Sequence, residues 1–84
     1  MKNIILNKLI KILEKRGPIQ LKKNENIENF NFLEKGLIDS IGLIKFIFEL
    51  EDCFNITLNE NDTTSKNFGE VKGLIKIIEL KLKN

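Results

Sequence analysis

The sequence predicts an all-α protein, a small four-helix bundle with a long first loop and a short third helix. Three observations lead to this prediction. Three segments repeat apolar residues with a period near 3.6, which is typical of helices. No segment shows the sustained alternation that indicates a strand. At 84 residues with 42% apolar content, the chain can bury one hydrophobic core, so we expect a single domain over residues 1–84.

The first helix is expected over residues 3–16. Apolar residues recur there at i, i+3, i+4 and i+7, which places them on one face of a helix. Gly17 and Pro18 end it, because glycine accepts the left-handed cap conformation and proline cannot continue the hydrogen-bond ladder. The expected core-facing residues are Leu6, Leu9, Ile10 and Leu13, flanked by Ile5 and Ile12.

Two further helices are expected over residues 41–54 and 71–82, and the polar segment between them has room for a short helical turn around residues 61–65. Phe46, Phe48 and Phe54 are expected to pack in the core. The apolar residues that carry the two helical patterns are Leu43, Ile44, Ile47, Leu50 and Phe54, and then Val71, Leu74, Ile75, Ile78 and Leu82.

Residues 17–39 form a connection of 23 residues without clear periodicity. A connection this long is unusual in a small domain unless it is functional or packed down by its own side chains. We expect its apolar residues to anchor it across the helices, so that it presents Asp39 and Ser40 at the start of the next helix. These anchoring residues are Ile27, Phe30, Phe32, Leu33, Leu37 and Ile38.

The chain has no histidine and one cysteine. Without histidine there is no Ser-His or Cys-His catalytic pair and no common zinc site, so we expect neither an enzyme nor a metal site. A lone cysteine forms no intramolecular disulfide and fits a reducing compartment, and Cys53 has no activating neighbour. No signal peptide or apolar run of about 18 residues is present, which favours a cytoplasmic protein without stable membrane insertion. We expect it to be a monomer.

Charge is segregated along the chain. Residues 1–23 carry seven basic and one acidic residue, residues 24–62 carry two and nine, and residues 63–84 carry five and two. A nucleic-acid binder clusters basic residues with aromatic ones, but the six Phe residues lie mostly in the acidic middle, so no nucleic-acid partner is expected. The basic ends could touch an anionic surface, although a composition rich in Lys, Asn and Ile is the simpler explanation.

Asp39 and Ser40 stand directly before an apolar helical pattern that starts at Ile41. Both residue types are favoured helix N-caps, so capping is one interpretation. The other is that Ser40 is a chemical handle at a helix N-terminus, where free N–H groups and the helix dipole favour a phosphate. Both interpretations hold together if Asp39 is the cap.

The stretch "GLIDSIGLIKFIFELEDCFNITL" resembles the signature of acyl carrier proteins and of their peptidyl, aminoacyl and D-alanyl relatives. That signature is a Gly, an Asp-Ser pair, an apolar residue, and an amphipathic helix that ends in acids and a Phe. The leading helix, the long loop, the polar segment and the closing helix follow the family order. The resemblance therefore covers nearly the whole chain and implies a bundle of acyl-carrier type.

The resemblance implies that Ser40 carries 4′-phosphopantetheine, attached from coenzyme A by a phosphopantetheinyl transferase, and that Asp39 helps metal-assisted docking of that transferase. The arm would hold an acyl intermediate as a thioester for loading and transferring enzymes of fatty-acid or specialised acyl biosynthesis. An aminoacyl carrier of D-alanyl type is an alternative. An unmodified helical interaction module is an alternative of another class.

The resemblance also implies that partners dock on the helix after Ser40, through Ile41 and the acids Glu49, Glu51 and Asp52. The simpler reading of these acids is a solvated face. Gly42 and Lys45 stand where many fatty-acid carriers have acids. These departures favour a specialised partner, and we expect Lys45 to repel the basic patches of housekeeping enzymes. Phe48 has a second possible role, in lining an acyl cavity.

Overall fold

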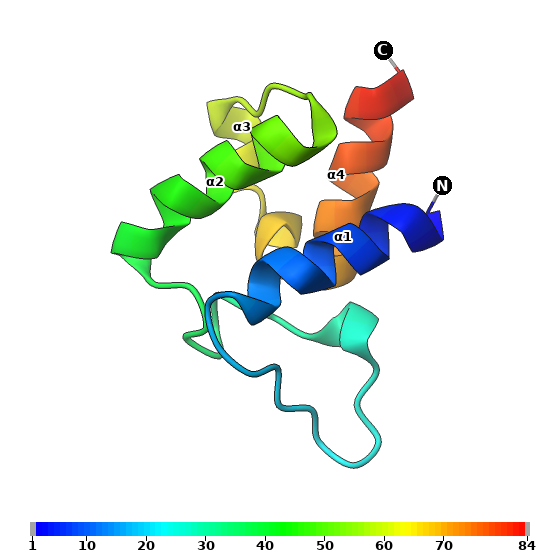
Figure 1. The fold of residues 1–84 in the computed structure, drawn as a ribbon, viewed down its shortest axis with the longest axis vertical. Helices are drawn as coiled ribbons and strands as arrows, with labels where there is room; N and C mark the ends of the chain where they lie inside the picture. Colours follow the sequence, from blue (N-terminus) through cyan, green and yellow to red (C-terminus); the bar gives the residue numbers. More distant parts are fainter. Residues whose placement is uncertain (1, 84) are drawn as a thin grey trace.

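The computed structural model describes residues 2–83, and it confirms the all-α prediction (Figure 1). None of these residues belongs to a strand, and the one β-bridge is an isolated pairing of Asn31 with Glu70. Among the described helices, none combines the length and apolar character that crossing a membrane requires. The helices are α1 (Lys2–Glu14), α2 (Ser40–Phe54), α3 (Glu60–Thr64) and α4 (Val71–Lys83), with the 3₁₀ turns η1 (Ile27–Asn29) and η2 (Lys66–Gly69).

The predicted elements match the observed ones to within two residues at each end. The first helix ends at Glu14 rather than at residue 16, because the backbone N–H of Arg16 bonds to the carbonyl of Leu13, the tighter i→i+3 pattern of a 3₁₀ turn. The short third helix is held at its start by a capping box, in which the side chains of Asn59 and Asp62 each accept a hydrogen bond from the other's backbone N–H.

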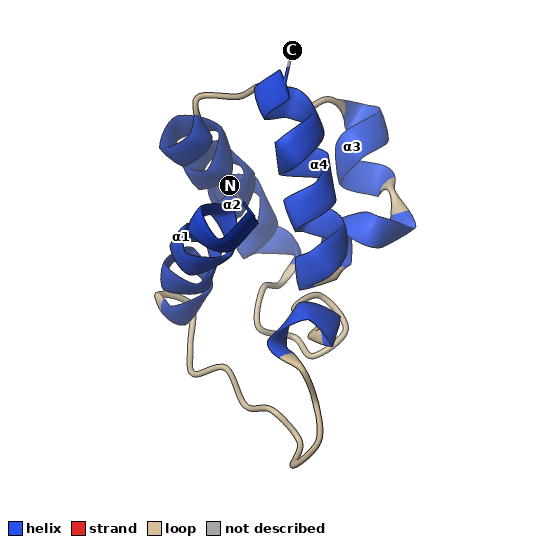
Figure 2. Cartoon of the chain, turned by 90° about the vertical axis from the view of Figure 1, so that its right-hand side faces the viewer, coloured by secondary structure: helices blue, strands red, loops and turns tan. Residues whose placement is uncertain are grey.

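α1 packs against both α2 and α4, and both 3₁₀ turns pack against α4. The connection between α1 and η1 extends away from the helices in both views (Figures 1 and 2). The returning part of the connection, after η1, runs back under the bundle to the start of α2. The long first loop thus has two parts: a projecting limb before η1, residues 15–26, and an anchored limb after η1, residues 30–39.

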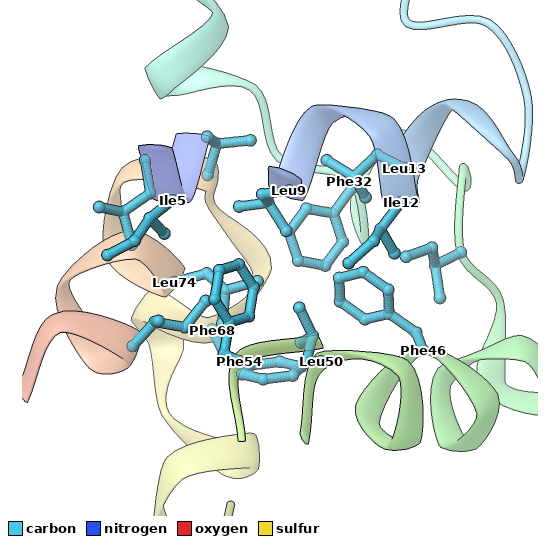
Figure 3. Packing of buried hydrophobic residues seen from close by; sticks show 14 of the residues in the cluster. Ile5, Leu9, Ile12, Leu13, Phe32, Phe46, Leu50, Phe54, Phe68 and Leu74 are labelled. Carbon is cyan, nitrogen blue, oxygen red and sulfur yellow. The ribbon is translucent and has the colours of Figure 1, made fainter. Parts of the chain in front are cut away.

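One cluster of buried side chains forms the core, and three phenylalanines contact one another edge to face within it (Figure 3). The ring of Phe32 lies 5.2 Å from that of Phe46 and 6.4 Å from that of Phe68, and the last two are 6.4 Å apart, measured between centroids. Such contacts contribute about 0.5–1.5 kcal/mol each beyond the burial of area. Phe32 comes from the loop, Phe46 from α2 and Phe68 from η2, so the cluster joins three separate segments.

The buried face of α1 differs from the predicted stripe. Leu9 and Leu13 are buried as expected, but Leu6 is only half-buried against the core, and Ile10 is half-buried. Because α1 packs against both α2 and α4, its buried face is wider than the predicted stripe and is not centred on the same residues. Ile5 and Ile12, expected only to flank the stripe, are buried.

On α2 the prediction was right for Phe46 and Phe54, which are buried, and wrong for Phe48, which is 63% exposed. Ile44, counted in the core pattern, is 60% exposed. Phe48 is two residues from Phe46 and from Leu50, and two residues correspond to about 200° of rotation around a helix. The face that buries Phe46 and Leu50 must therefore turn Phe48 outward.

The apolar residues of the long loop anchor it, as predicted. Phe30, Phe32 and Ile38 are buried, and the other three expected anchors are partly buried against the same cluster. Two backbone hydrogen bonds fix the anchored limb to the end of η2 and to the start of α4. The N–H of Phe32 donates to the carbonyl of Gly69 at 3.0 Å, and the N–H of Val71 donates to the carbonyl of Phe30 at 3.0 Å.

An ion pair ties α3 to α4: Lys81 Nζ lies 2.8 Å from Asp62 Oδ2. Burial raises the pKa of the Asp62 carboxyl, but the hydrogen bond from the Asn59 N–H and the nearby Lys81 ammonium outweigh it, so the pKa lies below its ordinary value. The carboxylate therefore stays charged and keeps both the cap and the ion pair at neutral pH.

Phe32→Ala is expected to lower the free energy of unfolding by about 3–5 kcal/mol, because it removes the ring that joins loop, α2 and η2. Phe48→Ala is the matched control, since it makes the same chemical change at an exposed position, and it should stay within about 0.5 kcal/mol of the parent protein. Urea denaturation followed by circular dichroism measures both. Equal losses for the two variants would contradict the assigned core.

Candidate functional site

A compact turn leads from the aromatic cluster to the start of α2. Asn31 Oδ1 accepts hydrogen bonds from the N–H groups of Leu33 and Glu34, at 3.1 and 2.9 Å. The carbonyl of Phe32 accepts from the N–H groups of Leu37 and Ile38, at 3.0 and 3.3 Å. Ile38 is buried and directly precedes Asp39. Phe32 thus has two roles. Its ring packs in the aromatic cluster of the core, and its carbonyl holds the turn that positions the first residues of α2.

Asp39 is the N-cap of α2. Its backbone is extended, its Oδ1 accepts a hydrogen bond from the Gly42 N–H at 2.7 Å, and its carbonyl accepts from the Leu43 N–H at 2.9 Å. The space beside this cap is small, since a Cβ on Gly42 would lie 3.2 Å from Asp39 Oδ1. Close approach of the capping carboxylate is therefore a local reason for glycine at position 42.

Ser40 is the first residue of α2, and it is exposed. Its hydroxyl makes no hydrogen bond to any residue in 2–83, and the N–H groups of Ser40 and Ile41 have no acceptor there either. Free N–H groups in the first turn are where a helix attracts an anion. An anionic group bonded to Ser40 Oγ would therefore lie at the positive end of α2.

Two of the three acids predicted to dock partners are engaged within the molecule. Glu49 forms ion pairs with Arg16 and, at 3.5 Å, with Lys15, which ties α2 to the end of α1. Glu51 Oε2 accepts a hydrogen bond from the Leu58 N–H at 2.8 Å, which fixes the segment after α2. Asp52 is exposed, and no residue in 2–83 pairs with it.

An exposed apolar stripe runs along α2 from the residue next to Ser40. It consists of Ile41, Ile44 and Phe48, which are 80%, 60% and 63% exposed. The spacing i, i+3, i+7 places them on one helix face, and Lys45 and Asp52 fall on that same face. We call these three residues the α2 stripe.

Sequence reasoning predicted Ile41 as a docking residue, and that role stays a prediction, but it assigned Ile44 and Phe48 to the core. A signal for the exposed pair was present in the sequence: residues 41–54 contain more apolar residues than one buried helix face needs. Cys53 is a free, exposed thiol on the same helix. The described residues contain no group of three side chains able to hold a metal ion.

Comparisons with family models, with curated proteins and with solved structures gave no match to this chain. The function is therefore argued from the site itself.

Asp39→Ala is expected to destabilise the protein by about 1 kcal/mol, because it leaves the Gly42 N–H without its acceptor. Ser40→Ala is the matched neighbour and should change stability by less than about 0.5 kcal/mol, since the Ser40 hydroxyl makes no hydrogen bond within residues 2–83. Thermal and urea denaturation of both variants give the comparison. A larger loss for Ser40→Ala would mean that Ser40 is the cap.

Proposed function

We propose that this chain is a carrier domain of acyl-carrier type, in which Ser40 is the attachment point of a 4′-phosphopantetheine arm. The observation that carries the proposal is the division of roles at the start of α2. Asp39 caps the helix, while the adjacent Ser40 hydroxyl is exposed and makes no hydrogen bond to the described residues. A serine that neither caps nor packs is available for modification.

The residues at the start of α2 fit a phosphopantetheine group attached to Ser40. The Ser40 hydroxyl supplies the ester oxygen, and the unpaired N–H groups of Ser40 and Ile41 favour the negative charge of a phosphodiester at that point. When bound, the arm supplies a thiol that holds an acyl group as a thioester. The order of elements, with a long anchored loop before α2 and a short α3 before α4, supports the same class.

The cargo is an acyl group of fatty-acid or specialised biosynthesis, with an aminoacyl group as the alternative. The partners are a phosphopantetheinyl transferase and the enzymes that load and discharge the arm. The proposed location is the cytoplasm, because a thiol-bearing arm and the exposed Cys53 both fit a reducing compartment.

Modification of Ser40 is tested by incubating the full chain with coenzyme A and a broad-specificity phosphopantetheinyl transferase. Intact mass should show one added arm, and peptide mapping should place it on Ser40. Ser65 is the internal control, because it is the only other serine and its Oγ already accepts the Asn67 N–H at 3.2 Å.

Ser40→Ala should remain unmodified while folding normally. An adduct on Ser65, or labelling of Ser40→Ala at the parent's rate, would refute the proposal.

The α2 stripe supports a second candidate, an unmodified interaction module that binds partners through the same face. Three exposed apolar side chains in one row form a surface of the kind that partner proteins cover. The two candidates share the docking face and differ only in whether Ser40 is modified. The mass measurement above therefore separates them.

In the carrier proposal, the transferase docks on the α2 stripe, and Phe48→Ala should raise its KM for the carrier about three- to tenfold with little change in kcat, since Phe48 lies away from the reacting hydroxyl. Asp52→Lys tests the one predicted docking acid, of Glu49, Glu51 and Asp52, that makes no ion pair or side-chain hydrogen bond within residues 2–83. Glu51→Gln is unsuitable, because it also disturbs the hydrogen bond to the Leu58 N–H.

Lys23→Ala, a change on the projecting loop, is the control and should leave KM unchanged. Unaltered KM for Phe48→Ala would place the docking face elsewhere.

A further inference from the structure

A cleft of about 660 Å³ lies between the two limbs of the long loop, separate from the α2 stripe. One wall is formed by residues 16–18 and 20–22 of the projecting limb, and the other by Phe30 and residues 35–37 of the anchored limb. Figures 1 and 2 show these limbs diverging below the bundle. The volume is within the range of about 300–1,000 Å³ typical of small-molecule sites.

The charged residues that line the cleft are all basic: Arg16, Lys22 and Lys35. Neither lysine ammonium has an ion-pair partner within residues 2–83. Arg16 is already paired with Glu49 through Nη2, so the uncompensated positive charge of the cleft is that of the two lysines. Two ammonium groups without ion-pair partners favour a ligand that brings a negative charge and hydrogen-bond acceptors.

Apolar side chains complete the lining. Phe30 is buried in the core, Leu37 is half-buried beside it, and Leu21 on the projecting limb is 42% exposed. The limbs approach closely where a Cβ on Gly17 would lie 3.2 Å from Leu37 Cδ1. We propose that this cleft binds an anionic group joined to a short apolar body, with the head at the basic residues and the body against Phe30, Leu37 and Leu21.

Such a ligand has two possible sources. It is either a free small molecule or the cargo of the proposed Ser40 arm, an acyl group that ends in a carboxylate. Leu37 precedes Ser40 by three residues, so their Cα atoms are at most about 11 Å apart. The tethered source rests on the proposed function, whereas binding of a free ligand does not.

The cleft is tested with the unmodified full chain, by following backbone amide NMR shifts during titration with hexyl phosphate. Saturable shifts are expected at residues 20–22 and 35–37. Inorganic phosphate and hexanol, which each supply half of the ligand, should bind more weakly. Lys35→Gln should weaken hexyl phosphate binding about threefold, the size expected for an exposed charge pair.

Lys23→Gln is the matched control, because Lys23 adjoins Lys22 and does not line the cleft. Absence of saturation, shifts confined to the α2 stripe, or equal affinities for the Lys35 and Lys23 variants would overturn the proposal. Hexanol binding as tightly as hexyl phosphate would overturn the anionic part of it.

Whether the ligand is free or tethered is tested on the protein that carries the arm on Ser40. The arm is loaded with a six-carbon acyl group that ends either in a carboxylate or in a methyl. If the cargo is the ligand, only the carboxylate form shifts the amides of residues 35–37, and Lys35→Gln abolishes the difference. If both forms behave alike while hexyl phosphate binds, the ligand is a free molecule. If Ser40 accepts no arm, the proposed function fails, and the hexyl phosphate titration still decides the cleft.

Discussion

The burial of Phe32 is the interaction on which the rest of this structure depends. Its ring is fully buried against Phe46 of α2 and Phe68 of η2, although it comes from a connection that has no regular structure at that point. Ordering so long a connection has a large entropic cost, which buried aromatic area is suited to offset. With Phe32 in place, its N–H donates to the carbonyl of Gly69, and its carbonyl accepts hydrogen bonds from the turn before α2. One residue therefore fixes both the end of η2 and the approach to α2.

The geometry of the candidate site follows from that constraint and from the length of one side chain. Ile38 is drawn into the core, which leaves Asp39 at the surface in an extended conformation. A carboxylate one carbon from the backbone reaches the Gly42 N–H, so Asp39 satisfies the cap and Ser40 has no structural task. The exposed hydroxyl at the head of α2 is thus a consequence of how the preceding loop is anchored.

Sequence periodicity predicted the type and approximate bounds of α1, α2 and α4, and the polar segment predicted α3, because each pattern is local. It did not predict which side of α2 faces outward. With apolar residues around most of that helix, the outward side is decided by the elements that pack on it, so Ile44 and Phe48 were misplaced. The cleft between the loop limbs likewise needs residues about fifteen positions apart to meet, and no local pattern encodes that meeting.

The segregated charge of the sequence has an explanation inside the molecule. Glu49 of the acidic middle pairs with Lys15 and Arg16 of the basic first segment, and Asp62 pairs with Lys81 of the basic last one. Two of the nine acids of the middle segment therefore form ion pairs with the basic segments, while the exposed face of α2 carries apolar side chains with Lys45 and Asp52 among them. In the proposed carrier role, a partner on this face would gain affinity chiefly from apolar contact, and the charges at Lys45 and Asp52 would select which partner fits.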